Sequence, residues 1–179
     1  VCSKFFRLFG KLHKVVNGGP RHDRAACSRV SWNPPKAPMR IATWNVNSIK
    51  QRLENLTAWL GERQPDIVCL HETKTVDEAF PRQPIEALGY NVAVHGQKTF
   101  NGVAILSKFK FDEVTPRLPG DNADDHARFI EVAVSTRTGV LRVASIYLPN
   151  GNPIETEKYT YKIKWMDRLI KYAQERLRL

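Results

Sequence analysis

The sequence predicts a layered α/β domain over residues 39–179, preceded by an extension of different character over residues 1–38. Three observations lead to this expectation. Short apolar runs of strand length are separated by glycines, two longer segments have helical periodicity, and prolines in residues 34–38 exclude a helix before the first strand. A chain of 179 residues with 42% hydrophobic residues is the size of one domain and can bury a sizeable core.

The first strand is expected at residues 40–44, and Ser48 is placed to act as the N-cap of the helix that follows. Apolar residues recur on one face of that helix at Ile49, Leu53, Leu56 and Leu60. Gly61 and Pro65 bracket the end of the helix. The apolar run at residues 66–70 then has the composition of a buried strand.

Four further strands are expected where apolar runs recur, at residues 90–94, 103–107, 129–135 and 141–147. Glycines punctuate these runs at Gly89, Gly102, Gly120 and Gly139. A final helix is expected from about Glu155. Its apolar face would consist of Ile163, Met166, Ile170, Ala173 and Leu177.

Most of the net charge of +10 lies in residues 1–38, which hold eight Lys and Arg residues and one Asp. The remaining residues hold 20 basic and 17 acidic side chains, so bulk charge is a weak argument for DNA binding by the folded part. Apolar residues at helical spacing between basic ones make the extension resemble a targeting or membrane-surface segment. The other interpretation, which we favour, is a disordered or non-native extension, because Met39 directly precedes a strand-like run as an initiator would.

The composition of the sequence indicates in which compartment the protein is expected. No stretch approaches the roughly 20 apolar residues of a membrane span. The three cysteines are odd in number and form no C-x-x-C pair, so neither a disulfide framework nor a zinc site is expected. We therefore expect a cytoplasmic protein without a membrane partner, and the oligomeric state stays open.

Three predicted strands end in polar residues suited to chemistry. Asn45 follows the first strand, where its carboxamide serves either a site or an ordinary Asx turn. Glu72 follows the second, and a carboxylate beside a buried strand needs a metal such as Mg²⁺ or an ion pair with Lys74 or an arginine. Tyr147 ends a later strand and either contacts a phosphate or caps the core with its ring.

These stretches and their order resemble the exonuclease III/AP endonuclease branch of the endonuclease/exonuclease/phosphatase superfamily. The segments that carry the resemblance are IATWNVNSI, PDIVCLHETK, LGYNVAVHGQK, FNGVAILSK and SIYLPNGNP, followed by KYTYKIKWMDRL. The resemblance covers residues from about Met39 to the end of the chain. It implies a DNase I-like fold, a four-layer α/β sandwich in which two packed β-sheets are flanked by helices.

The resemblance also implies roles for individual residues. Asn45 would orient the phosphate near the metal, Glu72 would be the metal ligand, and Tyr147 would lie beside the scissile phosphate. Asn150 would contact the DNA backbone and Arg128 a phosphate.

Lys74 would keep Glu72 charged. His71 departs from the family, which usually has glutamine there, and is interpreted as a neighbour of the ligand. The implied activity is Mg²⁺- or Mn²⁺-dependent hydrolysis of double-stranded DNA at abasic sites or 3′ ends.

The later part of the family's machinery is not found after Tyr147. A Gly-Asp-(Phe/Met)-Asn segment and a terminal Asp-His pair are expected there, but Gly120-Asp121 and Asp125-His126 both precede Tyr147. We therefore expect a truncated form of the nuclease in which the C-terminal half of the domain is missing. Two alternatives remain open: a half-domain that binds DNA or a partner without cutting, and a superfamily phosphoesterase with a non-DNA substrate.

Overall fold

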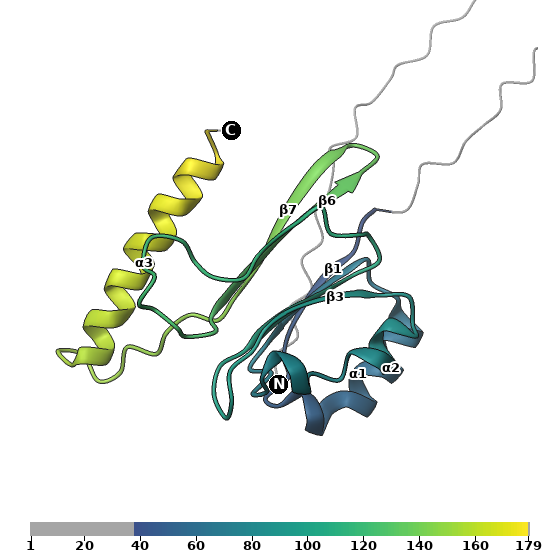
Figure 1. Ribbon diagram of the computed structural model, residues 1–179, viewed down its shortest axis with the longest axis horizontal. Coiled ribbons are helices and arrows are strands. Elements are labelled where there is room, and N and C mark those ends of the chain that lie inside the picture. Colours follow the sequence, from purple (N-terminus) through teal and green to yellow (C-terminus); the bar gives the residue numbers. More distant parts are fainter. Residues whose placement is uncertain (1–37, 179) are drawn as a thin grey trace, which may run out of the picture. The chain divides into compact units, whose positions relative to one another are not determined.

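The computed structural model describes residues 38–178, so the expectation for the extension concerns residues outside the described part. The first sheet contains four strands in the order β1-β2-β4-β3. These strands are β1 (Ile41–Asn45), β2 (Ile67–His71), β3 (Asn91–His95) and β4 (Val103–Ser107). The β1–β2 pair is parallel and the other pairs are antiparallel (Figure 1). The predicted strands are confirmed to within one residue.

The second sheet is an antiparallel arrangement of β5 (Glu113–Thr115), β6 (Phe129–Thr136) and β7 (Gly139–Ile146). The short, mostly exposed β5 was not predicted, because three residues without a buried face give no periodicity. Strand β7 begins two residues earlier than expected and ends before Tyr147. Tyr147 is therefore the first residue of the following loop rather than the last of the strand.

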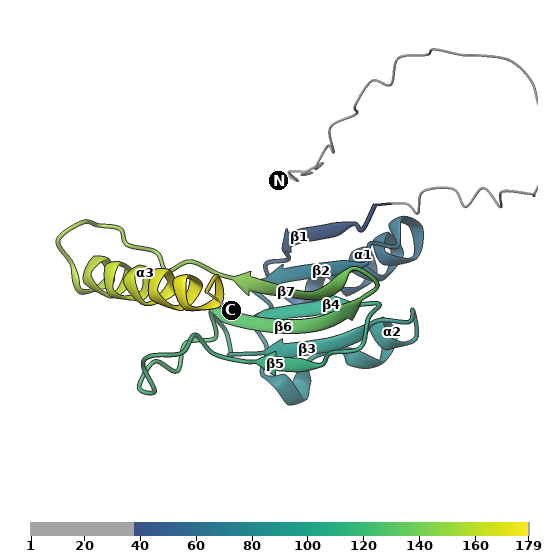
Figure 2. The ribbon, with the colours of Figure 1, turned by 90° about the horizontal axis from the view of Figure 1, so that it is seen from above.

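Four layers result from the way the helices cover the two sheets. Helices α1 (Ile49–Arg63) and α2 (Arg82–Glu86) lie on one face of the first sheet, and a short 3-10 helix, η1 (Asp77–Ala79), precedes α2. The second sheet covers the opposite face, and α3 (Glu157–Arg176) lies beyond the second sheet (Figures 1 and 2). This arrangement confirms the predicted four-layer sandwich.

Successive side chains of a strand point to opposite faces of the sheet, and they fill the three interfaces between these layers. In β2, Val68 and Leu70 join the core under α1 and α2, while Ile67 and Cys69 face the second sheet. In β6, Phe129 faces α3 and packs with its aromatic side chains. The central strands β2, β4 and β6 are thus buried on both faces, which explains why they consist largely of apolar residues. Strands β1, β5 and β7 keep exposed positions.

Helix α1 has the predicted buried face and the predicted ends, but not the predicted side-chain cap. Ser48 occupies the N-cap position with φ of 90°, yet its side chain makes no capping hydrogen bond. The N–H of Ser48 instead donates to the Glu72 carbonyl at 2.8 Å, and the N–H of Ile49 donates to that of Thr73 at 3.0 Å. The helix ends at Arg63, between Gly61 and Pro65 as expected, and left-handed Gln64 forms its C-terminal turn.

The prediction for the buried face of α3 was wrong. Ile163, Ile170 and Leu177 are exposed by 40%, 51% and 88%, whereas Trp165 and Tyr172 are buried against the second sheet. The helix has two apolar stripes, and the larger aromatic side chains of one of them fill the space over β6 and β7. Thr156 caps the helix by accepting from the N–H of Tyr159 at 3.4 Å.

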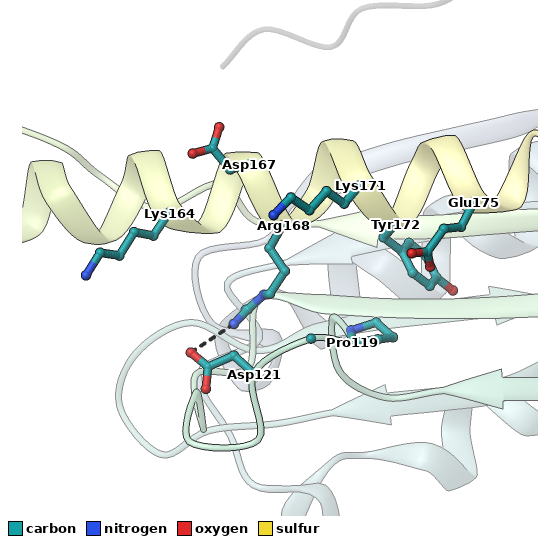
Figure 3. Close-up of a pocket in the computed structure, with 9 residues that line it drawn as sticks. Pro119, Asp121, Lys164, Asp167, Arg168, Lys171, Tyr172 and Glu175 are labelled. Atoms are coloured by element: carbon teal, nitrogen blue, oxygen red, sulfur yellow. Dashed lines mark ion pairs between the residues drawn. The ribbon is translucent and has the colours of Figure 1, made fainter.

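A buried ion-pair network joins α3 to the loop between β5 and β6. The Asp124 side chain is only 5% exposed and pairs with the guanidinium of Arg168. Arg168 also pairs with Asp121 at 3.2 Å (Figure 3), and the hydroxyl of Tyr161 donates to Asp124 at 3.0 Å. The same helix and loop line a cavity of about 450 Å³ with charged groups of both signs. None of the helices within residues 38–178 has the length and apolar composition needed to span a bilayer.

Gly102 brings the loop after β3 against the segment that follows β2. Its φ is +87°, and a Cβ there would lie 2.1 Å from the Thr73 hydroxyl oxygen. The Gly102 carbonyl accepts from the N–H of Thr73 at 3.1 Å, and the Asn101 carbonyl accepts from that of Lys74 at 3.1 Å. The glycine therefore permits a backbone approach that fixes the residues directly after Glu72.

Replacement of Asp124 by asparagine is expected to lower the unfolding free energy by about 3 kcal/mol at pH 7, because it breaks a buried ion pair. Burial raises the Asp124 pKa, but hydrogen bonds from Arg168, Tyr161 and His126 outweigh it and leave that pKa below the ordinary 3.8. The wild-type contribution is therefore present above pH 4 and is lost as the pH falls below it. Denaturant unfolding between pH 3 and 7 measures this, and a difference that stays constant would contradict it.

Gly102→Ala should destabilise the protein by roughly 2–4 kcal/mol, since it combines left-handed strain with a clash. Gly89→Ala is the matched control, because Gly89 has a φ of +84° but no atom within 4 Å of the added Cβ. That variant should cost about 1 kcal/mol. Equal losses in denaturant unfolding would show that the contact with Thr73 is unimportant.

Candidate functional site

Two parallel strands bring Asn45 and Glu72 together. Asn45 is the last residue of β1, and its register partner His71 is the last residue of β2. The carboxyl ends of parallel strands meet at the same edge of a sheet, so Glu72 emerges beside Asn45. The Asn45 Nδ2 donates to Glu72 Oε1 at 2.7 Å.

Tyr147 reaches the same carboxylate from the second sheet. Ser145 in β7 is fully buried, and its Oγ donates to the Leu70 carbonyl of β2 at 3.1 Å. This bond between the sheets holds the end of β7 over the end of β2. The Tyr147 hydroxyl donates to Glu72 Oε1 at 3.0 Å, although the two residues are 75 positions apart in the sequence.

Lys74 completes the environment of Glu72. Its Nζ lies 3.2 Å from Glu72 Oε2 and also donates to the Asn47 Oδ1. The ion pair considered from the sequence is therefore present. Asn47 was missed as a site residue, and the signal for it was the second asparagine of Asn45-Val46-Asn47 at a turn between strand and helix.

The hydrogen bonds keep Glu72 ionised. Burial raises the Glu72 pKa, but the hydrogen bonds from Asn45, Tyr147 and Lys74 and the Lys74 charge outweigh it and leave the pKa below 4.5. For Tyr147, burial and then the bond to Glu72 raise the phenol pKa above its ordinary value. Burial lowers the His71 pKa more than the Glu72 charge raises it, so His71 is neutral at pH 7.

Backbone strain is concentrated around this carboxylate. Asn47, Ser48, Glu72 and Lys74 have φ values of 44°, 90°, 54° and 54°, which lie in the left-handed region. Such conformations are uncommon for residues other than glycine and cluster at functional sites. The strain shows that surrounding contacts hold these four residues in place.

Arg128 lies against Tyr147. Its guanidinium carbon is 5.2 Å from the centre of the Tyr147 ring, and its Nη1 donates to the Tyr147 carbonyl at 3.4 Å. Its Nε is buried and has no hydrogen-bond partner among the described residues. Five of the six site residues expected from the sequence thus lie together. Contacts connect Asn45, Glu72, Lys74, Tyr147 and Arg128 into one group.

Asn150 lies in the loop after β7 and is exposed. Its Oδ1 accepts from the N–H of Asn152 at 3.1 Å, which is a turn contact. Among the described residues, its side chain makes no hydrogen bond to the group that surrounds Glu72.

The chemistry of this group suits a hard cation or an oxyanion. The Glu72 side chain is 20% exposed, so its carboxylate is accessible from solvent. Carboxylate and carboxamide oxygens are ligands of Mg²⁺, which needs only one or two carboxylates when phosphate and water supply the rest. Among residues 38–178, no three His, Cys, Asp or Glu side chains gather into a complete metal site. Glu72 therefore supplies only part of the ligands that a bound cation would need.

Comparisons with known proteins show which family has this arrangement. The model of the endonuclease/exonuclease/phosphatase family matches residues 42–178. Exodeoxyribonuclease III of Haemophilus influenzae is 36% identical over 138 residues, covering 76% of this chain and 52% of that protein. The solved AP endonuclease of Archaeoglobus fulgidus is 38% identical with a TM-score of 0.71. The match covers 77% of this chain and 52% of the chain of that endonuclease.

A second solved structure, the 3′ phosphatase NExo from Neisseria bound to a product DNA hairpin, is 34% identical with a TM-score of 0.73. The match covers 78% of this chain and 53% of that one. The chain thus spans about half the length of the relatives it matches. Since the family model extends over most of the chain and the fold agrees with that of solved relatives, this chain belongs to the endonuclease/exonuclease/phosphatase family.

Proposed function

We propose that this chain carries one half of the active site of a metal-dependent phosphodiesterase that acts on DNA in repair, of the exodeoxyribonuclease III and AP endonuclease type. The observation that carries the proposal is the convergence of three separate segments on the Glu72 carboxylate. Similarity to exodeoxyribonuclease III and to AP endonucleases supports the choice of reaction. The proposed substrate is double-stranded DNA with abasic sites or 3′ ends to be trimmed.

Glu72 is the proposed ligand of Mg²⁺ or Mn²⁺, and the Asn45 carboxamide lies beside it. When bound, the metal would neutralise charge that develops on the phosphate and the leaving oxygen. Burial raises the pKa of this carboxyl, but the hydrogen bonds from Asn45, Tyr147 and Lys74 and the Lys74 charge hold it below its ordinary value, so that the carboxyl is ionised and can bind a cation. The proposed role of Asn45 is to orient the phosphate near that position.

Tyr147 and Arg128 are proposed to bind the phosphate. The Tyr147 phenol keeps its proton at neutral pH, because burial and Glu72 raise its pKa. This single hydrogen is donated to Glu72 Oε1 in the structure, and the proposed role requires it to turn to a phosphate oxygen when DNA binds. The guanidinium of Arg128 beside the phenol supplies positive charge and donors suited to phosphate. Asn150, further along the same loop, is the proposed contact to the DNA backbone.

A second candidate function is DNA binding without cleavage. It is favoured by the contact between Arg128 and Tyr147, since these two side chains offer phosphate contacts that need no metal. This candidate predicts affinity for duplex DNA whose logarithm falls with log salt at a slope of about −0.9 per phosphate contacted.

Glu72→Gln tests the metal assignment in the 179-residue chain. The substitution should weaken Mn²⁺ affinity, measured by electron paramagnetic resonance, by at least about tenfold, because it removes the charged ligand. Glu62→Gln is the matched control, since Glu62 is exposed and, within residues 38–178, pairs with its neighbour Arg63 alone. Unchanged Mn²⁺ affinity in Glu72→Gln would refute the assignment.

Incubation of the chain with an abasic duplex and Mg²⁺ separates the two candidate functions. Incision that is lost in Glu72→Gln and kept in Glu62→Gln supports the phosphodiesterase. Salt-sensitive binding that survives Glu72→Gln, with no incision by either protein, supports the binding module instead.

A further inference from the structure

Residues 124–128 connect α3 to the Glu72 site, although α3 contributes no side chain to that site. Asp124 is held from α3 by the Tyr161 hydroxyl at 3.0 Å and by the guanidinium of Arg168. Its side chain is 5% exposed, and this buried position limits its freedom to move. The start of the segment is therefore fixed to the outer layer of the fold.

A first series of hydrogen bonds runs from Asp124 to the carboxylate. The backbone N–H of His126 donates to Asp124 Oδ1 at 3.3 Å, and the N–H of Arg128 donates to the His126 carbonyl at 2.8 Å. The Arg128 carbonyl then accepts from the N–H of Tyr147 at 2.8 Å. The Tyr147 hydroxyl ends the series at Glu72 Oε1, at 3.0 Å.

A second series leaves the same segment and reaches the other side of Glu72. The Ala127 carbonyl accepts from the N–H of Gly102 at 2.9 Å, and the Gly102 carbonyl accepts from that of Thr73 at 3.1 Å. Thr73 is the residue directly after Glu72. The Ala127 N–H is also satisfied, because it donates to Gln97 Oε1 at 3.2 Å. The orientation of this short segment thus affects both Tyr147 and the backbone at Glu72.

We propose that Asp124, held by Tyr161 and Arg168, is a positioning residue for the Glu72 site. It acts through residues 126–128, which set the place of the Tyr147 phenol and of the backbone at Thr73. The role in metal binding rests on the proposed function, whereas the effect on the hydrogen bond between Tyr147 and Glu72 does not. Arg128 is positioned by the same segment, since its own N–H is bonded to His126.

A matched control exists on the same helix. The Tyr172 hydroxyl donates to Glu131 Oε1 at 2.9 Å, just as that of Tyr161 donates to Asp124 at 3.0 Å. Both phenols therefore attach α3 to a carboxylate of the layer below. Glu131 lies within β6, however, and not in residues 124–128. Tyr161→Phe and Tyr172→Phe make the same chemical change, and only the first removes a bond to the segment that leads to Glu72.

The test follows the Tyr147 ring by NMR in the full 179-residue chain labelled with ¹³C-tyrosine. The chain has 5 tyrosines, and loss of one signal in Tyr147→Phe assigns the ring. Tyr161→Phe and Asp124→Asn should shift the Tyr147 signal and weaken Mn²⁺ affinity by roughly three- to thirty-fold. Tyr172→Phe should leave the Tyr147 signal and the Mn²⁺ affinity unchanged, even where its unfolding midpoint falls as much as that of Tyr161→Phe.

The proposal is overturned if the Tyr147 signal stays in place in Tyr161→Phe, or if Tyr172→Phe moves it equally. Where Asp124→Asn does not fold, Tyr161→Phe alone decides, because it removes a single hydroxyl and keeps the ion pair with Arg168. Absence of Mn²⁺ binding in the unmodified chain would contradict the proposed function. The NMR comparison would still decide whether Asp124 positions Tyr147.

Discussion

The ionised Glu72 carboxylate is the group on which the arrangement of this edge of the molecule depends. A charge at the end of a buried strand is costly unless donors surround it. Asn45, Tyr147 and Lys74 supply those donors from β1, from the end of β7 and from the turn after β2. Surrounding this one carboxylate with donors therefore requires the two sheets to pack in one fixed position. The same contacts hold the left-handed backbone at Glu72 and Lys74.

The fold supplies this convergence through two ordinary features. Parallel pairing of β1 with β2 brings their carboxyl ends together, and the bond from Ser145 to the Leu70 carbonyl fixes one sheet over the other. The contacts made by Gly102 and by residues 124–128 then hold the flanking backbone. The strands of the two sheets thus form the inner layers, and the residues of the candidate site lie in the turns at one edge of them.

The sequence predicted the features that depend on local patterns. The strands and the buried face of α1 follow from periodicity, whereas the four layers were expected from the family resemblance. Asn45, Glu72 and Tyr147 were selected because each ends or follows a predicted strand. It could not predict the buried face of α3, because that helix has two apolar stripes and only packing against β6 selects Trp165 and Tyr172. The roles of Gly102 and Asp124 depend on contacts between distant segments, which a single sequence does not reveal.

The central claim is that Glu72 is a metal ligand in a phosphodiesterase half-site rather than only the partner of Lys74. Anomalous diffraction from crystals of the chain soaked in Mn²⁺ tests it most directly. The account predicts a manganese peak within about 2.0–2.3 Å of a Glu72 carboxylate oxygen, the range in which divalent cations take oxygen ligands. An ordered Glu72 still bonded to Lys74, with no peak beside it at saturating Mn²⁺, would contradict the account.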